Sequence, residues 1–178
     1  MKSDVILIDN LGNGFGDAVK ETKKAAEFRG LSHKDALQLQ LMAEEMLSMA
    51  RSVTGEMQAS FWLESQEKAF DLHMTTKTVM DQEKRYQLIS SSTSRKNEAA
   101  NSFLGKLRDA FEAAMAAEKD YESYELPPEV QADLVGRNFE SPEWDRYEQS
   151  VLFRLADNVS IAIRGGRVNM TVTKYFKP

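Results

Sequence analysis

The stretch MQASFWLESQEKAFDLHM, residues 57–74, decides the fold class of this chain. Apolar residues alternate with polar ones on both sides of a polar turn at 65–68. A period of two is typical of a strand with one buried face, so the two runs predict a β-hairpin. A second hairpin is predicted at 159–175, where the alternation resumes around Gly165-Gly166.

The segment before the first hairpin has a helical period instead. Residues 17–29 and 32–53 repeat apolar residues at steps of three and four, which predicts two helices. Gly30 ends the first helix, and Ser32 with Asp35 resembles a capping box for the second. The second of these is the clearest helix in the sequence.

A third long helix is predicted over residues 98–118, between the two hairpins. Residues 82–90 fit a helical turn, and 91–97 read as a polar loop that leads into the long helix. We expect the apolar residues of this third helix to face inward: Phe103, Leu104, Leu107, Phe111 and Met115.

The order of these parts predicts an α+β fold. A short strand at 5–8 comes first, and a short helix containing Val151, Leu152 and Leu155 precedes the last hairpin. Antiparallel strands on one side and long helices on the other make a two-layer sandwich. We expect a single domain over residues 1–178, with an acidic insertion at about 119–149.

Composition narrows the classes of function. The chain has 178 residues, of which 42% are hydrophobic and 29% charged, with a net charge of −5 and no cysteine. The lack of cysteine excludes disulfides, zinc ribbons and thiol nucleophiles. Ten acidic against three basic residues between Glu118 and Glu148 argue against nucleic acid there. No apolar run is long enough for a membrane span or a signal peptide, so we expect a cytoplasmic protein with no nucleic-acid or membrane partner.

Two motifs that suggest cofactors are better explained otherwise. The glycines of residues 12–16 follow a strand, but the third glycine of a dinucleotide fingerprint would fall at Asp17, so a glycine turn is predicted. His33 and His73 lack a second ligand at metal-binding spacing, so no metal site is predicted.

Two other segments leave alternatives open. Glu44-Glu45 borders the Met-rich face of the second helix, where Glu45 is either a surface acid or points into a cleft. The loop at 91–97 supplies hydroxyls and two cations before a helix, which fits an anion site or an N-capping loop equally well.

Residues 27–32, EFRGLS, and 36–47, ALQLQLMAEEML, resemble the ATP-binding fold of anti-sigma factor kinases and sensor histidine kinases. This GHKL superfamily builds a Bergerat pocket between the helices and a lid. The resemblance implies that Glu45 is the catalytic base. The position of the family's magnesium-binding asparagine is Met49, whose thioether is a poor ligand for a hard cation.

The other motifs of the family are reduced. The Asp-x-Gly-x-Gly motif corresponds to 74–81, which has neither glycine, although Thr76 offers a hydroxyl. Residues 92–97 and 103–106 resemble the lid with one glycine kept, and 168–176 resembles the closing strand. The resemblance thus implies nucleotide or anion contacts from Thr76, Ser92, Thr93, Arg95, Lys96, Asn97, Gly105 and Lys106.

The resemblance covers roughly residues 14–118 and 150–176 and predicts a degenerate member of the superfamily. The first functional hypothesis is therefore a non-catalytic regulatory or interaction protein with an unidentified protein partner, a homodimer being open. One alternative is an ATP-binding serine kinase of the anti-sigma type. The other is binding of a nucleotide or anion without turnover. No cofactor is certain: ATP stays open, magnesium is disfavoured and no metal is expected.

Overall fold

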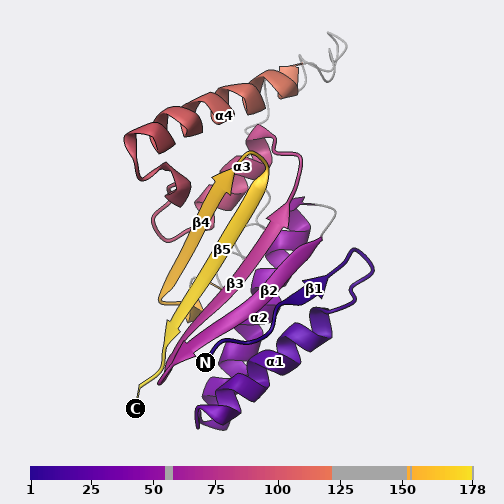
Figure 1. Ribbon diagram of the computed structural model, residues 1–178, viewed down its shortest axis with the longest axis vertical. Helices are drawn as coiled ribbons and strands as arrows, with labels where there is room; N and C mark the ends of the chain where they lie inside the picture. Colours follow the sequence, from indigo (N-terminus) through magenta and orange to yellow (C-terminus); the bar gives the residue numbers. More distant parts are fainter. Residues whose placement is uncertain (55–57, 122–151, 153, 178) are drawn as a thin grey trace, which may run out of the picture.

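The computed structural model describes residues 1–54, 58–121, 152 and 154–177. Its sheet has five strands, all antiparallel, in the order β1-β2-β3-β5-β4 (Figure 1). The strands are β1 (Ile6–Ile8), β2 (Ala59–Gln66), β3 (Ala69–Lys77), β4 (Asn158–Arg164) and β5 (Arg167–Tyr175). Both predicted hairpins are therefore confirmed.

Alternation along each strand separates two faces of the sheet. Phe61 pairs with Met74 and Leu63 with Leu72, and these four side chains are buried in the core. The neighbouring positions project from the opposite face, which carries mainly polar and charged residues. Register is fixed by this pattern, because a slip of one residue would exchange the two faces.

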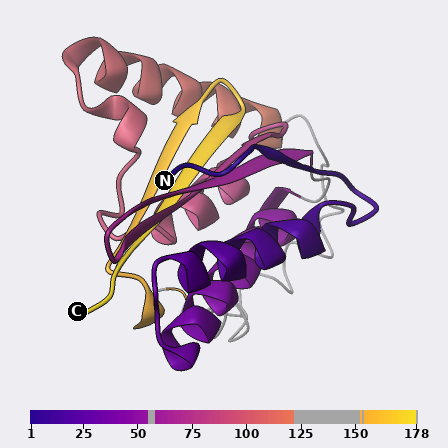
Figure 2. The same ribbon diagram turned by 60° about the horizontal axis from the view of Figure 1, so that its bottom comes forward.

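Helices α1 (Phe15–Phe28) and α2 (His33–Thr54) lie together on one side of the sheet (Figure 2). Their buried face packs against the apolar side of the strands in one core. The Asp35 amide donates to Ser32 Oγ at 3.1 Å, and that hydroxyl donates to the Asp35 carboxylate at 2.7 Å. The predicted helix start and the α+β class of the fold are both confirmed.

The predicted helix at 98–118 is corrected by the structure. A 3₁₀ turn, η1 (Glu98–Ala100), comes first, and α4 (Phe103–Tyr121) begins only after it. Ser102 causes the division, because its hydroxyl accepts a hydrogen bond from the Gly105 amide at 3.0 Å and caps α4. Residues 82–90 form a complete helix, α3, capped by Asp81.

Most of the acidic insertion expected at 119–149 lies outside the described residues, as does Val151 of the predicted short helix. From that helix, Leu152 is buried and Leu155 packs against the core. Among the described helices, none is long and apolar enough to cross a membrane. The described residues also hold no group of three acidic or histidine side chains that could bind a metal ion.

Candidate functional site

The residues predicted from the ATP-binding resemblance begin on α2 and β3. Glu45 is half-buried next to the fully buried Met46. Met49, at the family's asparagine position, packs against the core. Thr76 is buried near the end of β3, and its hydroxyl donates to the Gln58 carbonyl at 3.0 Å. A thioether packs well among apolar side chains, so the position of Met49 fits a core residue and does not fit a metal ligand.

The loop at 91–97 is joined to the body by its own polar side chains. The buried Ser92 hydroxyl donates to the Ile89 carbonyl at 2.8 Å. Thr93 accepts from the Val159 amide at 2.7 Å and donates its own amide to the Val159 carbonyl at 2.8 Å. Arg95 and Lys96, which follow Thr93 in the loop, are exposed. The loop is thus held against the start of β4, with its two cations in solvent.

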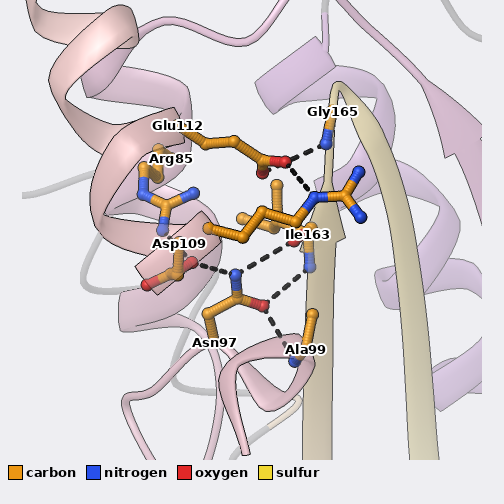
Figure 3. Close-up of polar contacts among 8 residues, drawn as sticks. Arg85, Asn97, Ala99, Asp109, Glu112, Ile163 and Gly165 are labelled. Atoms are coloured by element: carbon orange, nitrogen blue, oxygen red, sulfur yellow. Dashed lines mark hydrogen bonds and ion pairs between the residues drawn. The ribbon is translucent and has the colours of Figure 1, made fainter. Parts of the chain in front are cut away.

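Asn97 is the centre of a polar network that joins three segments (Figure 3). Its side-chain oxygen accepts from the amides of Ile163 at 2.8 Å and Ala99 at 3.1 Å. Its side-chain nitrogen donates to the Ile163 carbonyl at 3.0 Å and to Asp109 of α4. Asp109 also forms an ion pair with Arg85 of α3, whose side chain is only 9% exposed. Asn97 therefore uses both ends of its amide inside the protein.

The last two predicted residues lie in the first turns of α4. A Cβ atom at Gly105 would lie 2.7 Å from the Ala99 carbonyl oxygen, so α4 and η1 approach closely here. Lys106, next to it, is exposed. The predicted catalytic residue is therefore on α2, and the predicted nucleotide residues are distributed over β3, the 91–97 loop and α4.

The apolar residues of α4 face solvent, which corrects the expected direction of this helix. Exposure is 74% for Leu104, 62% for Leu107, 66% for Phe111 and 42% for Met115. We call these four residues the α4 stripe. A helical period shows which residues share a face, but it does not show which face packs inward.

The inward face of α4 is polar instead. Asp109 binds Arg85 and Asn97, and Glu112 accepts from the Gly165 amide at 3.1 Å and from Arg108 at 2.8 Å (Figure 3). These charge-assisted bonds fix α4 across the end of the sheet. Phe103, which was also expected to face inward, has a side chain outside the described set.

The side of the sheet away from α1 and α2 contains a broad open trough of about 2190 Å³. It extends from β1 across β2, β3, β5 and β4 to η1 and α4. Thr76 lines it, whereas the other predicted nucleotide residues do not. Its basic lining residues are Lys77, Lys84, Arg108, Arg164 and Arg167, and its acidic ones are Asp9 and Glu98.

Trp62 and His73 face each other from β2 and β3 on this open side of the sheet. Their rings stack at 5.0 Å between centroids, and His73 Nδ1 lies 3.1 Å from the Thr171 hydroxyl. Burial lowers the pKa of His73, with a smaller opposing effect from Glu64. The folded state thus favours the neutral imidazole.

Protein stability should therefore fall as the pH is lowered below about 7. The unfolded chain, with a histidine pKa near 6.5, binds a proton before the folded chain does, so acid favours unfolding. Urea unfolding at several pH values would measure the slope. His73→Gln should flatten it. An unchanged slope in the His73 variant would contradict the assignment.

The fold and the site define a small α+β protein with an all-antiparallel sheet that is open on one face. No family model matches the chain, and no curated protein matches it. Among solved structures, the chain is similar to one in the crystal structure of the SiaB-SiaC complex from Pseudomonas aeruginosa. The two share 9% sequence identity with a TM-score of 0.49, over 98% of this chain and 91% of that one. The function is therefore inferred from the chain's own residues.

Proposed function

We propose that this chain is a non-catalytic regulatory protein on a degenerate GHKL-type fold, and that it acts by binding another protein. The α4 stripe carries the proposal. Four large apolar side chains on one helix face are exposed together, and contiguous patches of this kind on soluble proteins mark interaction surfaces. A partner helix would cover them in the manner of a helix packed along a groove.

The attachment of α4 supports this role, because the helix is held in position while its stripe stays exposed. Arg85, Asn97 and Gly165 bind its inward carboxylates. A surface that is already ordered loses less conformational entropy when a partner binds. The polar inward face thus anchors α4, and its apolar outward face is left exposed for a partner protein.

The charge beside the stripe suggests the chemistry of the partner. Arg108, four residues after Leu104 and three before Phe111, borders the stripe, and its side chain is 60% exposed. Complementary charge at the rim of an interface favours correct encounter and orientation. We therefore propose a partner with an apolar helix face bordered by acidic residues.

The absence of catalysis in this proposal is supported by the motif positions. Met49 packs against the core at the position where the family has a magnesium ligand. The side chains of Ser92 and Asn97 make internal hydrogen bonds. A nucleotide would have to compete with these bonds to use the same side chains.

The proposal can be tested by photo-crosslinking in cells that express the protein naturally. A photoreactive phenylalanine analogue at position 107 should form a crosslink to a distinct protein, whereas the same group at Leu37, an exposed leucine of α2, should not. The crosslinked protein is then purified and titrated against the chain. Phe111→Glu should weaken that binding by at least about thirtyfold, the effect typical of a hot-spot residue, and Leu37→Glu by less than twofold.

Three results would contradict the proposal. One is equal crosslinking from positions 107 and 37, and another is unchanged affinity in Phe111→Glu. The third concerns the kinase alternative: phosphate transfer from ATP that Glu45→Gln abolishes would show that the protein is an enzyme. Sedimentation of the purified chain with and without Phe111→Glu shows whether the partner is a second copy.

A further inference from the structure

Three basic residues form one row across the open face of the sheet. Lys77 of β3 pairs with Arg167 of β5, and Arg167 pairs with Arg164 of β4. Residues that are paired directly across strands project from the same face with Cβ atoms about 5 Å apart. The adjacent positions, Thr76 and Val168, are buried, with 2% and 0% of their surfaces exposed. The three cations, here called the basic row, therefore project into the open trough.

The members of the basic row lie apart from the acids that the structure describes. In the described part of the chain, none of its three members makes an ion pair. Like charges directly opposite each other destabilise a strand pair. Folding therefore places three cations together, and among the described residues no acid lies within ion-pair distance of them.

The two acids of the trough are engaged elsewhere. Asp9 accepts from the amides of Leu11 at 2.9 Å and Asn13 at 3.0 Å, and the hydrogen bond from the Asn13 side chain lowers the pKa of Asp9. Glu98 accepts from the Ser94 hydroxyl at 2.7 Å, which lowers the pKa of Glu98. Both carboxylates thus stay charged in local turns.

The other two cations of the trough are already partly neutralised. Lys84 lies 3.6 Å from Asp81 and Arg108 lies 2.8 Å from Glu112. The positive charge available to a ligand is therefore concentrated on the basic row.

Protection of a sheet edge does not explain the row. Basic residues on edge strands prevent association between sheets, but in the order β1-β2-β3-β5-β4 only β4 of these three strands is at an edge. Lys77 and Arg167 lie on interior strands. Their position fits binding of an external anion better than edge protection.

The geometry favours a ligand with several closely spaced negative charges. Three adjacent strands span about 10 Å, which is too wide for a single small ion to contact the whole row. An extended acidic peptide spaces the side chains of one face about 7 Å apart, so it brings few carboxylates to the row. A linear oligophosphate carries more charge over the same length, and arginine binds phosphate through paired hydrogen bonds.

Base stacking contributes little to recognition here. The Trp62 ring is covered by His73 at 5.0 Å and by the Lys2 ammonium at 5.7 Å. We propose that the basic row Lys77–Arg167–Arg164 is a binding site for an oligophosphate group, either the phosphate chain of a nucleotide or an inorganic polyphosphate. This site is on the sheet face opposite α1 and α2 and is separate from the α4 stripe.

The test is calorimetric titration of the full chain with tripolyphosphate in EDTA, at low and at physiological salt. Wild type should bind, and added salt should weaken binding because the contacts are electrostatic. The triple variant Lys77→Gln, Arg164→Gln, Arg167→Gln should bind at least about thirtyfold more weakly, and each single variant several-fold more weakly. The matched control Lys23→Gln, Lys34→Gln, Arg51→Gln removes three exposed cations from α1 and α2, on the other side of the sheet, and should keep wild-type affinity.

Thermal melts provide an independent check on the variants. Because the triple variant removes repulsion between facing strands, its melting temperature without ligand should equal or exceed that of wild type. Weakened binding in such a variant cannot be attributed to unfolding. A melting temperature well below that of wild type would contradict the repulsion on which the proposal rests.

Comparison of probes identifies the source of the phosphate. ATP that binds about tenfold more tightly than tripolyphosphate would support a nucleotide, and equal binding would support an inorganic chain. The proposal is overturned if wild type does not bind tripolyphosphate at ~1 mM, if the triple variant binds as wild type does, or if hexaglutamate binds as tightly as tripolyphosphate.

Discussion

Asp109→Ala is expected to lower the free energy of unfolding by about 3 kcal/mol, and to release α4 from the end of the sheet. Asp109 is the carboxylate that pairs with Arg85, and it also accepts a hydrogen bond from Asn97. The Arg85 side chain is only 9% exposed, so after the substitution its charge would be nearly buried without a partner. Loss of one partner from a buried ion pair typically costs several kcal/mol.

A double-mutant cycle can separate the charge from the packing. Arg85→Met should be destabilising by itself, because Asp109 then keeps a single partner, Asn97. The combination Arg85→Met with Asp109→Ala removes both charges, so it should lose clearly less stability than the sum of the two single variants. Urea unfolding followed by circular dichroism gives each free energy.

The exposed ion pair of the same helix is a matched control. The Arg108 side chain is 60% exposed where it meets Glu112, so Arg108→Ala should cost less than about 1 kcal/mol. Equal destabilisation by Arg108→Ala and Asp109→Ala would contradict the central role of the buried network. Faster proteolysis within α4 in Asp109→Ala alone would show that the network holds the helix in place.

The strands and the first two helices could be predicted because their signals are local. Period-two alternation over 57–74 determines which side chains share a face, and a short turn then fixes the pairing. Ser32 similarly marks the start of α2 through a contact with Asp35 three residues away. Each of these inferences needed only residues that are neighbours in the chain.

The direction of α4 could not be predicted, because it depends on residues far away in the sequence. The apolar period of Leu104, Leu107 and Phe111 is real, but Arg85 and Asn97 attract the opposite, acidic face inward. The buried state of Asn97 depends likewise on its pairing with Ile163 of β4. The sequence pattern identified 91–97 as a polar loop, but only the fold shows which of its side chains already make internal hydrogen bonds.

The basic row is a second case of a feature that arises from strand order. Lys77 ends one hairpin, and Arg164 and Arg167 flank the turn of the other, where each is an ordinary surface cation. Placement of β5 directly beside β3 brings the three into one row. The turn at Gly165-Gly166 predicts the pairing of Arg164 with Arg167, but nothing in the local sequence places Lys77 beside them.

Gly14→Ala is the second substitution for which we expect a large effect, a loss of about 3 kcal/mol of stability. Gly14 precedes α1 with φ of +83°, and a Cβ atom there would lie 2.1 Å from the Leu7 carbonyl oxygen. The positive φ alone costs an alanine about 1–2 kcal/mol. The overlap with backbone adds to this cost, because β1 or the start of α1 would have to move.

Two neighbouring glycines separate these effects. Gly12 has φ of +86° with nothing within 4 Å of its added Cβ, so Gly12→Ala should lose only the conformational part, about 1 kcal/mol. Gly16 has neither a positive φ nor a near contact, so in the first turn of α1 the change to alanine should be neutral or slightly stabilising. Urea unfolding of the three variants should therefore rank Gly14→Ala well below Gly12→Ala, and Gly16→Ala highest.

The ranking also tests why this glycine-rich turn is present. Leu7 and Asp9 line the trough, so a turn that seats α1 tightly against β1 also shapes one wall of the basic-row site. If Gly14→Ala is as stable as Gly12→Ala, the close approach to Leu7 is wrong. If instead the order holds, tripolyphosphate binding by Gly14→Ala and Gly12→Ala distinguishes two roles for the turn. Binding that weakens only in Gly14→Ala indicates that the β1 wall contributes to the site, and equal binding assigns the site to the three cations alone.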